Sequence, residues 1–208
     1  MIKKAFTMAE VLITLGLVGV LALAAVPTIN KNNEQKVAKD FERVYQNLNS
    51  NVFYYEPVYK KGQIIASKLE LDNIDNCTKN CFAKNYKTIS GNPYPVNFKN
   101  TKMGILLYGE RLAINEHGTI YVDINGPKGP NIKCKDLFEF EFYNYNVYPA
   151  NTHINFHIND VFKFNSFPKF ELSNILSKHS DEELQSFIHT EGKYCELKIV
   201  ADNFVIKY

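Results

Sequence analysis

The sequence lacks a strong excess of charge of either sign. It has 24 Lys and Arg residues against 22 Asp and Glu residues, a net charge of +2. If Lys3 and Lys4 are set aside, the basic count falls to 22 and equals the acidic count. The overall charge therefore gives no reason to expect binding to nucleic acid.

Glycine and proline are also scarce, with 10 and 8 residues among 208. With 45% hydrophobic and 13% aromatic residues, this composition excludes a linker or a disordered chain and allows one globular domain plus an appendage. A Ser-His-Asp order, a Walker loop and a nucleotide-binding glycine fingerprint are all missing. We therefore expect no enzyme and no cofactor.

Charged residues are missing from one long stretch near the N-terminus. The twenty residues between Glu10 and Lys31 carry no charge and are mostly apolar. A helix of that length spans about 30 Å, close to the hydrocarbon thickness of a bilayer. Lys3 and Lys4 precede the stretch and would keep its start in the cytoplasm. The sequence therefore predicts a membrane-spanning helix over residues 9–29.

Helical periodicity continues beyond this stretch. Apolar residues recur at intervals of three and four, and charged residues occupy the opposite face. The apolar positions are Val37, Phe41, Val44, Tyr45, Leu48, Val52 and Tyr55. We expect a leader over residues 1–5, followed by one long helix over residues 6–56 that is amphipathic in its second half. Pro57 and the following Lys-Lys-Gly would end this helix.

A secretory signal peptide is the alternative interpretation of the N-terminus. Ala22-Leu23-Ala24 is an Ala-x-Ala sequence, and cleavage near Ala24 would release a soluble exported binding protein. Glu10 would then lie inside the apolar region, where a carboxylate costs about 2.5–3.5 kcal/mol on insertion scales. The helical pattern also continues past the cut. An uncut membrane-anchored enzyme is a third alternative, and the missing catalytic motifs count against it.

Residues 4–10, Lys-Ala-Phe-Thr-Met-Ala-Glu, resemble the processing site of type IV pilins and of the pseudopilins of type II secretion. In that family the cut falls before a Phe that is then N-methylated, and the fifth mature residue is Glu. The resemblance places the cut between Ala5 and Phe6, the methyl group on Phe6 and the family's acid at Glu10. Pro27 stands where the family commonly has a helix-loosening proline. Ala5 replaces the usual Gly, and Met8-Ala9 replaces the common Leu-Ile.

The resemblance implies a structural subunit of a fibre. Such a subunit crosses the bacterial inner membrane once, with its head in the periplasm or exterior, and it polymerises through its first helix into a type IV pilus or a secretion pseudopilus. The implied partners are other pilin or pseudopilin subunits, the prepilin peptidase and the inner-membrane assembly platform. Glu10 would pair with the N-terminal ammonium of a neighbour, because each charge alone is costly in hydrocarbon. Pro27 would allow local melting when the subunit leaves the bilayer.

Residues 57–208 have the pattern of a globular head. A connecting region is expected up to about residue 102, and short apolar runs separated by turn residues then predict an antiparallel meander. The expected strands are 104–108, 111–115, 119–124 and 137–142, with 197–200 and 204–206 closing the sheet. Ser180 and Glu183 have the spacing of a capping box that opens a short helix. The predicted fold class is α+β, pilin-like, with the long helix packed on an antiparallel sheet.

The cysteines indicate an oxidising compartment. Cys77, Cys81, Cys134 and Cys195 form an even set in a chain with an export-type start, which favours disulfides. Three full pairings remain open, and one of them includes a local bridge between Cys77 and Cys81. A single close pair of cysteines argues against zinc.

Residues 123–136 contain oxygen-bearing side chains at close spacing. Asp123, Asn125, Asn131 and Asp136 are candidate ligands for Ca²⁺. The stretch lacks the acidic series and the terminal Glu of an EF-hand loop, and Asn-Gly is a common turn signal. We expect a structural turn here, with calcium binding as the alternative.

Overall fold

The computed structural model describes most of the chain. The described residues are 6–50, 54–60, 63–70, 75–77, 81–98, 101–115, 119–143, 146–151 and 174–207. Among these, the side chains of residues 24, 27–30, 50, 54–60, 63–70, 75–76, 142–143 and 146 are outside the description. The chain divides into two compact units, residues 1–36 and 37–208. Its helices and antiparallel strands confirm the α+β class.

The first helix, α1, covers Met8–Ser50. Its large apolar side chains up to Val26 are 43–83% exposed where they are described. Within the described part of the chain, no helix combines the length and apolarity needed to cross a membrane. The predicted span, residues 9–29, includes residues 24 and 27–30, whose side chains lie outside the described set.

The helix ends earlier than the sequence predicts. α1 stops at Ser50, and the strand β1 (Tyr54–Lys60) follows and pairs antiparallel with β2 (Gln63–Glu70). The prediction of helix up to residue 56 is therefore wrong. Aromatic and β-branched residues dominate residues 54–59 and favour a strand, and Pro57 cannot continue a helix.

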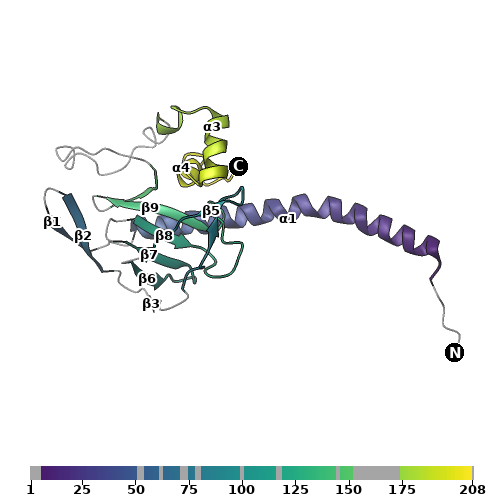
Figure 1. The fold of residues 1–208 in the computed structure, drawn as a ribbon, viewed down its shortest axis with the longest axis horizontal. Coiled ribbons are helices and arrows are strands. Elements are labelled where there is room, and N and C mark those ends of the chain that lie inside the picture. Colours follow the sequence, from purple (N-terminus) through teal and green to yellow (C-terminus); the bar gives the residue numbers. More distant parts are fainter. Residues whose placement is uncertain are drawn as a thin grey trace. The chain divides into compact units, whose positions relative to one another are not determined.

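A six-stranded antiparallel sheet forms the centre of the second unit (Figure 1). Its order is β10-β9-β8-β7-β6-β3. The strands are β3 (Asp75–Asn76), β6 (Lys102–Ile105), β7 (Arg111–Ile114), β8 (Thr119–Asp123), β9 (Leu137–Tyr143) and β10 (Asn146–Pro149). The predicted meander is confirmed from β6 to β9. The predicted connecting region up to residue 102 instead contains β1, β2, β3 and a further pair, β4 (Tyr86–Lys87) and β5 (Pro93–Tyr94).

The alternation of side chains along the strands divides the core into two layers. Leu112 and Ile114 pack in one cluster with residues 41–48 of α1, and Ala113 packs in another with Phe82. The Phe41 ring meets Phe138 edge-on, with centroids 4.8 Å apart. Residues 41–48, in the second half of α1, therefore cover one face of the sheet, and residues 81–98 cover the other face. The packing predicted for Phe41, Val44 and Leu48 is confirmed.

The C-terminal region is helical where strands were predicted. It contains α3 (Asp181–Ser186), the π-helix η2 (Phe187–Glu191) and α4 (Cys195–Ala201). The strand predicted over residues 197–200 is wrong because this short apolar run lies in α4 and buries Leu197, Ile199 and Val200 in the core. Residues 204–206 form no strand. The predicted capping box is confirmed, because Ser180 and Glu183 exchange both hydrogen bonds at the start of α3.

Candidate functional site

The N-terminal segment has an ordered helix start. Glu10 Oε2 accepts hydrogen bonds from the backbone N–H of Thr7 at 2.8 Å and from the Thr7 hydroxyl at 2.9 Å. Thr7 Oγ1 in turn accepts from the backbone N–H of Glu10 at 3.3 Å. This is a capping box, which satisfies donors that a helix start leaves unpaired. Within one chain, Glu10 therefore already has partners.

The predicted cleavage position lies at the edge of the described chain. Ala5 is outside the described residues, and the Phe6 side chain is 84% exposed. Pro27 lies within the helical backbone of α1, but its side chain is outside the described set. The cleavage, the methylation of Phe6 and the melting at Pro27 all stay predictions.

The loop after β8 gathers the four candidate calcium ligands. Asp136 accepts hydrogen bonds from the backbone N–H of Asn131 at 2.6 Å and of Ile132 at 2.5 Å, and from the Asn125 amide at 3.2 Å. Asp123 accepts from the backbone N–H of Asn125 at 3.2 Å. Both carboxylates thus act as acceptors for the chain itself, an arrangement that fixes a turn.

Asp123 is buried beside a tyrosine. Its carboxyl group accepts a hydrogen bond from the Tyr86 hydroxyl. Burial raises the pKa of Asp123 to about 7, the Tyr86 hydrogen bond opposes that rise, and the Asp136 charge adds to it. Burial also raises the pKa of Asp136, against the hydrogen bonds from Ile132 and Asn131. The pair is thus closer to neutral than two exposed carboxylates would be.

Both cysteine pairs form disulfides, one local and one long-range. Cys77 bonds to Cys81, and Cys134 bonds to Cys195 across 61 residues of sequence; the Cα atoms are 5.7 Å apart in each pair. The second bond ties the loop before β9 to α4. Cys134 has a positive φ of 73°, a conformation that usually favours glycine. The preference for disulfides is confirmed, and the structure selects the pairing that includes the local bridge.

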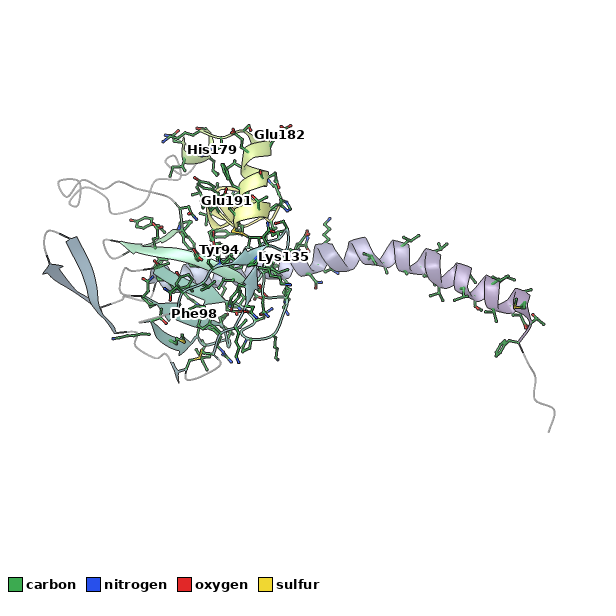
Figure 2. The ribbon with its side chains drawn as sticks, viewed as in Figure 1. Tyr94, Phe98, Lys135, His179, Glu182 and Glu191 are labelled. Carbon is green, nitrogen blue, oxygen red and sulfur yellow. A yellow bond between two sulfur atoms is a disulfide. The ribbon has the colours of Figure 1, made fainter. Side chains whose placement is uncertain are left out.

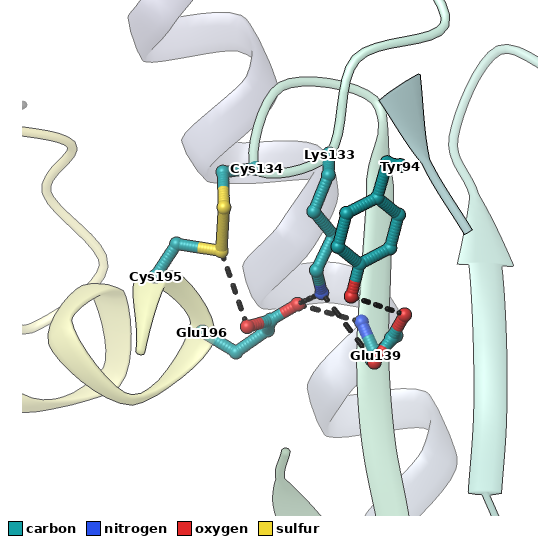
Figure 3. Close-up of a disulfide and its surroundings, with 6 residues drawn as sticks. All are labelled: Tyr94, Lys133, Cys134, Glu139, Cys195 and Glu196. Atoms are coloured by element: carbon teal, nitrogen blue, oxygen red, sulfur yellow. Dashed lines mark hydrogen bonds and ion pairs between the residues drawn. A yellow bond between two sulfur atoms is a disulfide. The ribbon is translucent and has the colours of Figure 1, made fainter. Parts of the chain in front are cut away.

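A buried polar cluster lies next to the long-range disulfide (Figure 3). Lys133 Nζ contacts Glu196 Oε1, and both side chains are fully buried. Glu139 Oε2 lies 4.0 Å from Lys133 Nζ, and the backbone N–H of Glu139 donates to Glu196 Oε1 at 2.7 Å. Tyr94 donates its hydroxyl proton to Glu139 Oε1 at 2.9 Å. We call Tyr94, Lys133, Glu139 and Glu196 the buried polar cluster.

Burial and neighbouring charges raise the pKa values of two groups in this cluster, the Glu196 carboxyl group and the Tyr94 phenol. Burial raises the pKa of Glu196, and the Lys133 charge opposes that rise. Burial also raises the pKa of the Tyr94 phenol, with the Glu139 charge acting in the same direction. Gly192 makes room for the lysine, because a Cβ there would lie 2.5 Å from Lys133 Cγ.

The residues of the cluster come from four parts of the head: Tyr94 from β5, Lys133 from the loop before β9, Glu139 from β9 and Glu196 from α4. Figure 2 labels Tyr94, at the end of β5, and Glu191, at the end of η2. A pocket of about 400 Å³ lies elsewhere, between residues 82–85 and the loop after β8. It is lined by Phe82, Ala83, Lys84, Asn85, Pro127 and Asn131. Among the described residues, no group of three or more His, Cys, Asp or Glu side chains is placed to hold a metal ion.

Sequence reasoning missed the two best-defined polar arrangements. The capping box at Thr7 was detectable, since Thr-Met-Ala-Glu has the Thr-x-x-Glu spacing just before an apolar run. The buried polar cluster had no comparable signal, because lysine and glutamate are normally exposed. Only the neighbouring cysteines, one residue before Glu196 and one after Lys133, distinguish these positions.

Comparison with protein-family models, with curated proteins and with solved structures finds no match for this chain. Its role must therefore be inferred from its own residues and their arrangement.

Proposed function

We propose that this chain is a structural subunit of a type IV pilus or a type II secretion pseudopilus. A prepilin peptidase cuts it after Ala5, Phe6 is N-methylated, and the mature subunit polymerises through α1. Before assembly, residues 9–29 hold it in the bacterial inner membrane with the head outside the cytoplasm. Other subunits and an inner-membrane assembly platform are its partners.

The observation that carries the proposal is the pattern of residues 5–10 before twenty uncharged residues. A small residue, a Phe and a Glu stand at the spacing of a prepilin processing site. The apolar run alone would suit any membrane anchor. A carboxylate at its start needs a partner in hydrocarbon, and the family pattern supplies one in the N-terminal ammonium of the next subunit.

The exposure of α1 supports the same conclusion. Its described apolar side chains before residue 27 lie mostly outside any core, with Leu12 67% and Leu23 78% exposed. Leaving such a surface in water is unfavourable by about 25 cal/mol for each Å². A bilayer before assembly and neighbouring copies of α1 afterwards would each cover it.

Glu10 has a role both in the single chain, through the capping box, and in the proposed fibre. In the single chain its carboxylate satisfies Thr7 at the helix start. In a fibre, the same carboxylate would also lie close to the N-terminal ammonium group of a neighbouring subunit if the helix of that subunit began level with Glu10. Removing the charge would leave the ammonium without a counter-ion, a loss of about 3–5 kcal/mol in a buried site.

The N-terminal sequence of the mature protein tests the proposal against the exported soluble protein. We expect mature chains to begin with methylated Phe6. Chains that begin at Ala25 would establish the signal-peptide alternative instead. The helix supports the first outcome, because α1 continues through residues 24 and 25 without a break.

An assembly assay tests the role of Glu10. We expect Glu10→Gln to reduce fibre formation at least tenfold while the protein still inserts into the membrane. Glu34→Gln is the matched control, because Glu34 is an exposed glutamate farther along the same helix. Equal assembly of the two variants would contradict the proposed pairing.

A further inference from the structure

Lys133 and Glu196 contact each other where water reaches neither side chain. Both are fully buried, and Lys133 Nζ touches Glu196 Oε1 (Figure 3). A buried ion pair is a costly arrangement, because desolvation of two charges can exceed their mutual attraction. The proposed polymerisation does not use this pair, which lies in the head. Its location therefore calls for a separate explanation.

We propose that Lys133 and Glu196 condense into an amide that covalently joins the loop before β9 to α4. The pair would then be an intramolecular cross-link one residue away from the Cys134–Cys195 disulfide at each end. The reaction requires no oxidant and no cofactor. It replaces two buried charges by one neutral amide, which removes the cost of holding them out of water.

Atoms and charge balance in this step. The Lys133 ammonium first gives a proton to the Glu196 carboxylate, which becomes the neutral acid, and the Nζ lone pair then attacks Glu196 Cδ. A C–N bond forms, one C–O bond of the carboxyl group breaks, and the oxygen leaves as water with two protons taken from Nζ. Ammonium plus carboxylate thus become amide plus one water molecule.

The surrounding groups match the needs of the reaction. The backbone N–H of Glu139 donates to Glu196 Oε1 at 2.7 Å and is placed to stabilise negative charge on that oxygen during the attack. Glu139 Oε2, 4.0 Å from Nζ, is the neighbouring carboxylate that would accept the second proton from Nζ and pass it on to the leaving oxygen. Tyr94 holds the other oxygen of Glu139. Contact between the reacting groups removes the entropic cost of bringing them together.

Glu196 itself is prepared for attack by its burial. Low polarity raises the pKa of its carboxyl group, which favours the neutral acid over the unreactive carboxylate. The other oxygen of this carboxyl group, Oε2, lies 3.1 Å from Cys195 Sγ. A disulfide sulfur has no proton to donate, so Oε2 receives no hydrogen bond from it and is the oxygen that leaves.

A second lysine–glutamate pair provides an internal comparison. Lys193 Nζ lies 2.6 Å from Glu191 Oε2, but these side chains are 50% and 43% exposed. Water solvates both charges there, and the structure places no other carboxylate within ion-pair distance of Lys193 in its described part. We expect this pair to stay ionic, although its two groups also touch.

Peptide mapping of the purified full-length chain tests the proposal. The fraction that contains the Cys134–Cys195 disulfide is isolated, since that bond shows that both segments have come together. It is then reduced, alkylated and digested. We expect a branched peptide that joins Lys133 to Glu196 and is lighter by one water molecule than its two parts. Recovery of the two segments only as separate linear peptides would overturn the proposal.

Two variants separate the cross-link from simple contact. Lys133→Arg keeps a cation that carboxyl groups do not acylate, so all its peptides should be linear. Glu139→Gln keeps the reacting pair but removes the proton carrier, and we expect at least a tenfold slower appearance of the branched peptide. Equal cross-linking in Glu139→Gln would exclude Glu139 from the reaction. Peptides of Glu191 and Lys193 should be linear in every sample.

Failure of this test leaves the fibre proposal unaffected, because polymerisation depends on residues 5–10 and on α1. In the same way, a mature chain that begins at Ala25 would still contain Lys133 and Glu196. The two inferences can therefore be rejected independently.

Discussion

The first half of α1 and the interior of the head distribute polarity in opposite ways. Leu15 and Leu17 are 64% and 60% exposed, whereas Lys133 and Glu196 are fully buried. A globular protein normally hides its leucines and exposes its lysines. The exposed apolar helix needs a surrounding that the single chain does not supply. The head, in contrast, surrounds Lys133 and Glu196 with polar partners from its own residues.

This contrast explains why the two regions suit different tasks. In the proposed function, a bilayer and then other helices surround the apolar segment, so the segment is suited to exchange one environment for the other. The head is closed by two disulfides and by a core that joins α1, the sheet and α4. These internal links hold the head together, as its proposed display on a fibre would require.

The largest effect is expected from breaking the buried polar cluster. Lys133→Met leaves the buried carboxyl group of Glu196 with no lysine to pair or condense with, and we expect it to lower the free energy of unfolding of the head by about 3–5 kcal/mol. Lys133→Met combined with Glu196→Gln should recover part of this loss, because the fully buried side chain at position 196 is then uncharged. Denaturant titrations followed by tyrosine circular dichroism measure both variants. A neutral effect of Lys133→Met would mean that water enters the site.

A matched pair of leucines in α1 tests the comparison directly. Leu48 is 2% exposed and Leu17 is 60% exposed. We expect Leu48→Ala to cost about 2–5 kcal/mol of unfolding free energy, because it leaves a cavity against the sheet. Leu17→Ala should change the same quantity by less than about 0.5 kcal/mol. Similar losses in the two variants would show that Leu17 has a partner within the single chain.

The pH dependence of stability should report the buried carboxyl group of Asp123. Its pKa is about 7 in the folded head and about 3.9 in an unfolded chain, so the folded state binds more protons between these values. The free energy of unfolding should therefore fall as the pH rises from about 4 to about 7, and level off above that range. Asp123→Asn should remove this part of the slope.

A second variant sharpens this measurement. The Tyr86 hydroxyl donates to Asp123 and lowers its pKa, so Tyr86→Phe should extend the fall in stability to higher pH. An identical pH profile for wild type and Asp123→Asn would contradict a buried, neutral Asp123.

The smallest effect is expected at the surface of the C-terminal region. Ser180 caps α3 through the backbone N–H of Glu183 at 3.2 Å. Ser180→Ala should cost about 1 kcal/mol of unfolding free energy. Ser177→Ala is the control, because Ser177 is exposed and lies before the helix; its effect should stay below about 0.5 kcal/mol. Equal losses would mean that the cap contributes nothing.

Local patterns determined much of this protein by themselves. The periodic placement of Phe41, Val44 and Leu48 specified the face that packs on the sheet, because a helix repeats every 3.6 residues whatever it contacts. Turn residues between short apolar runs specified the strands from β6 to β9, and Ser180 specified the start of α3. Residues 5–10 carry the resemblance on which the proposed role rests.

Only the tertiary structure decided the rest. Residues 197–200 are apolar enough for a strand or a buried helix, and packing against the core selects the helix. The cysteine pairing, the burial of Lys133 and the loss of water around Glu196 depend on residues about 60 positions apart coming together. A sequence pattern records what neighbours along the chain favour, whereas burial and the pKa of a carboxyl group depend on neighbours in space.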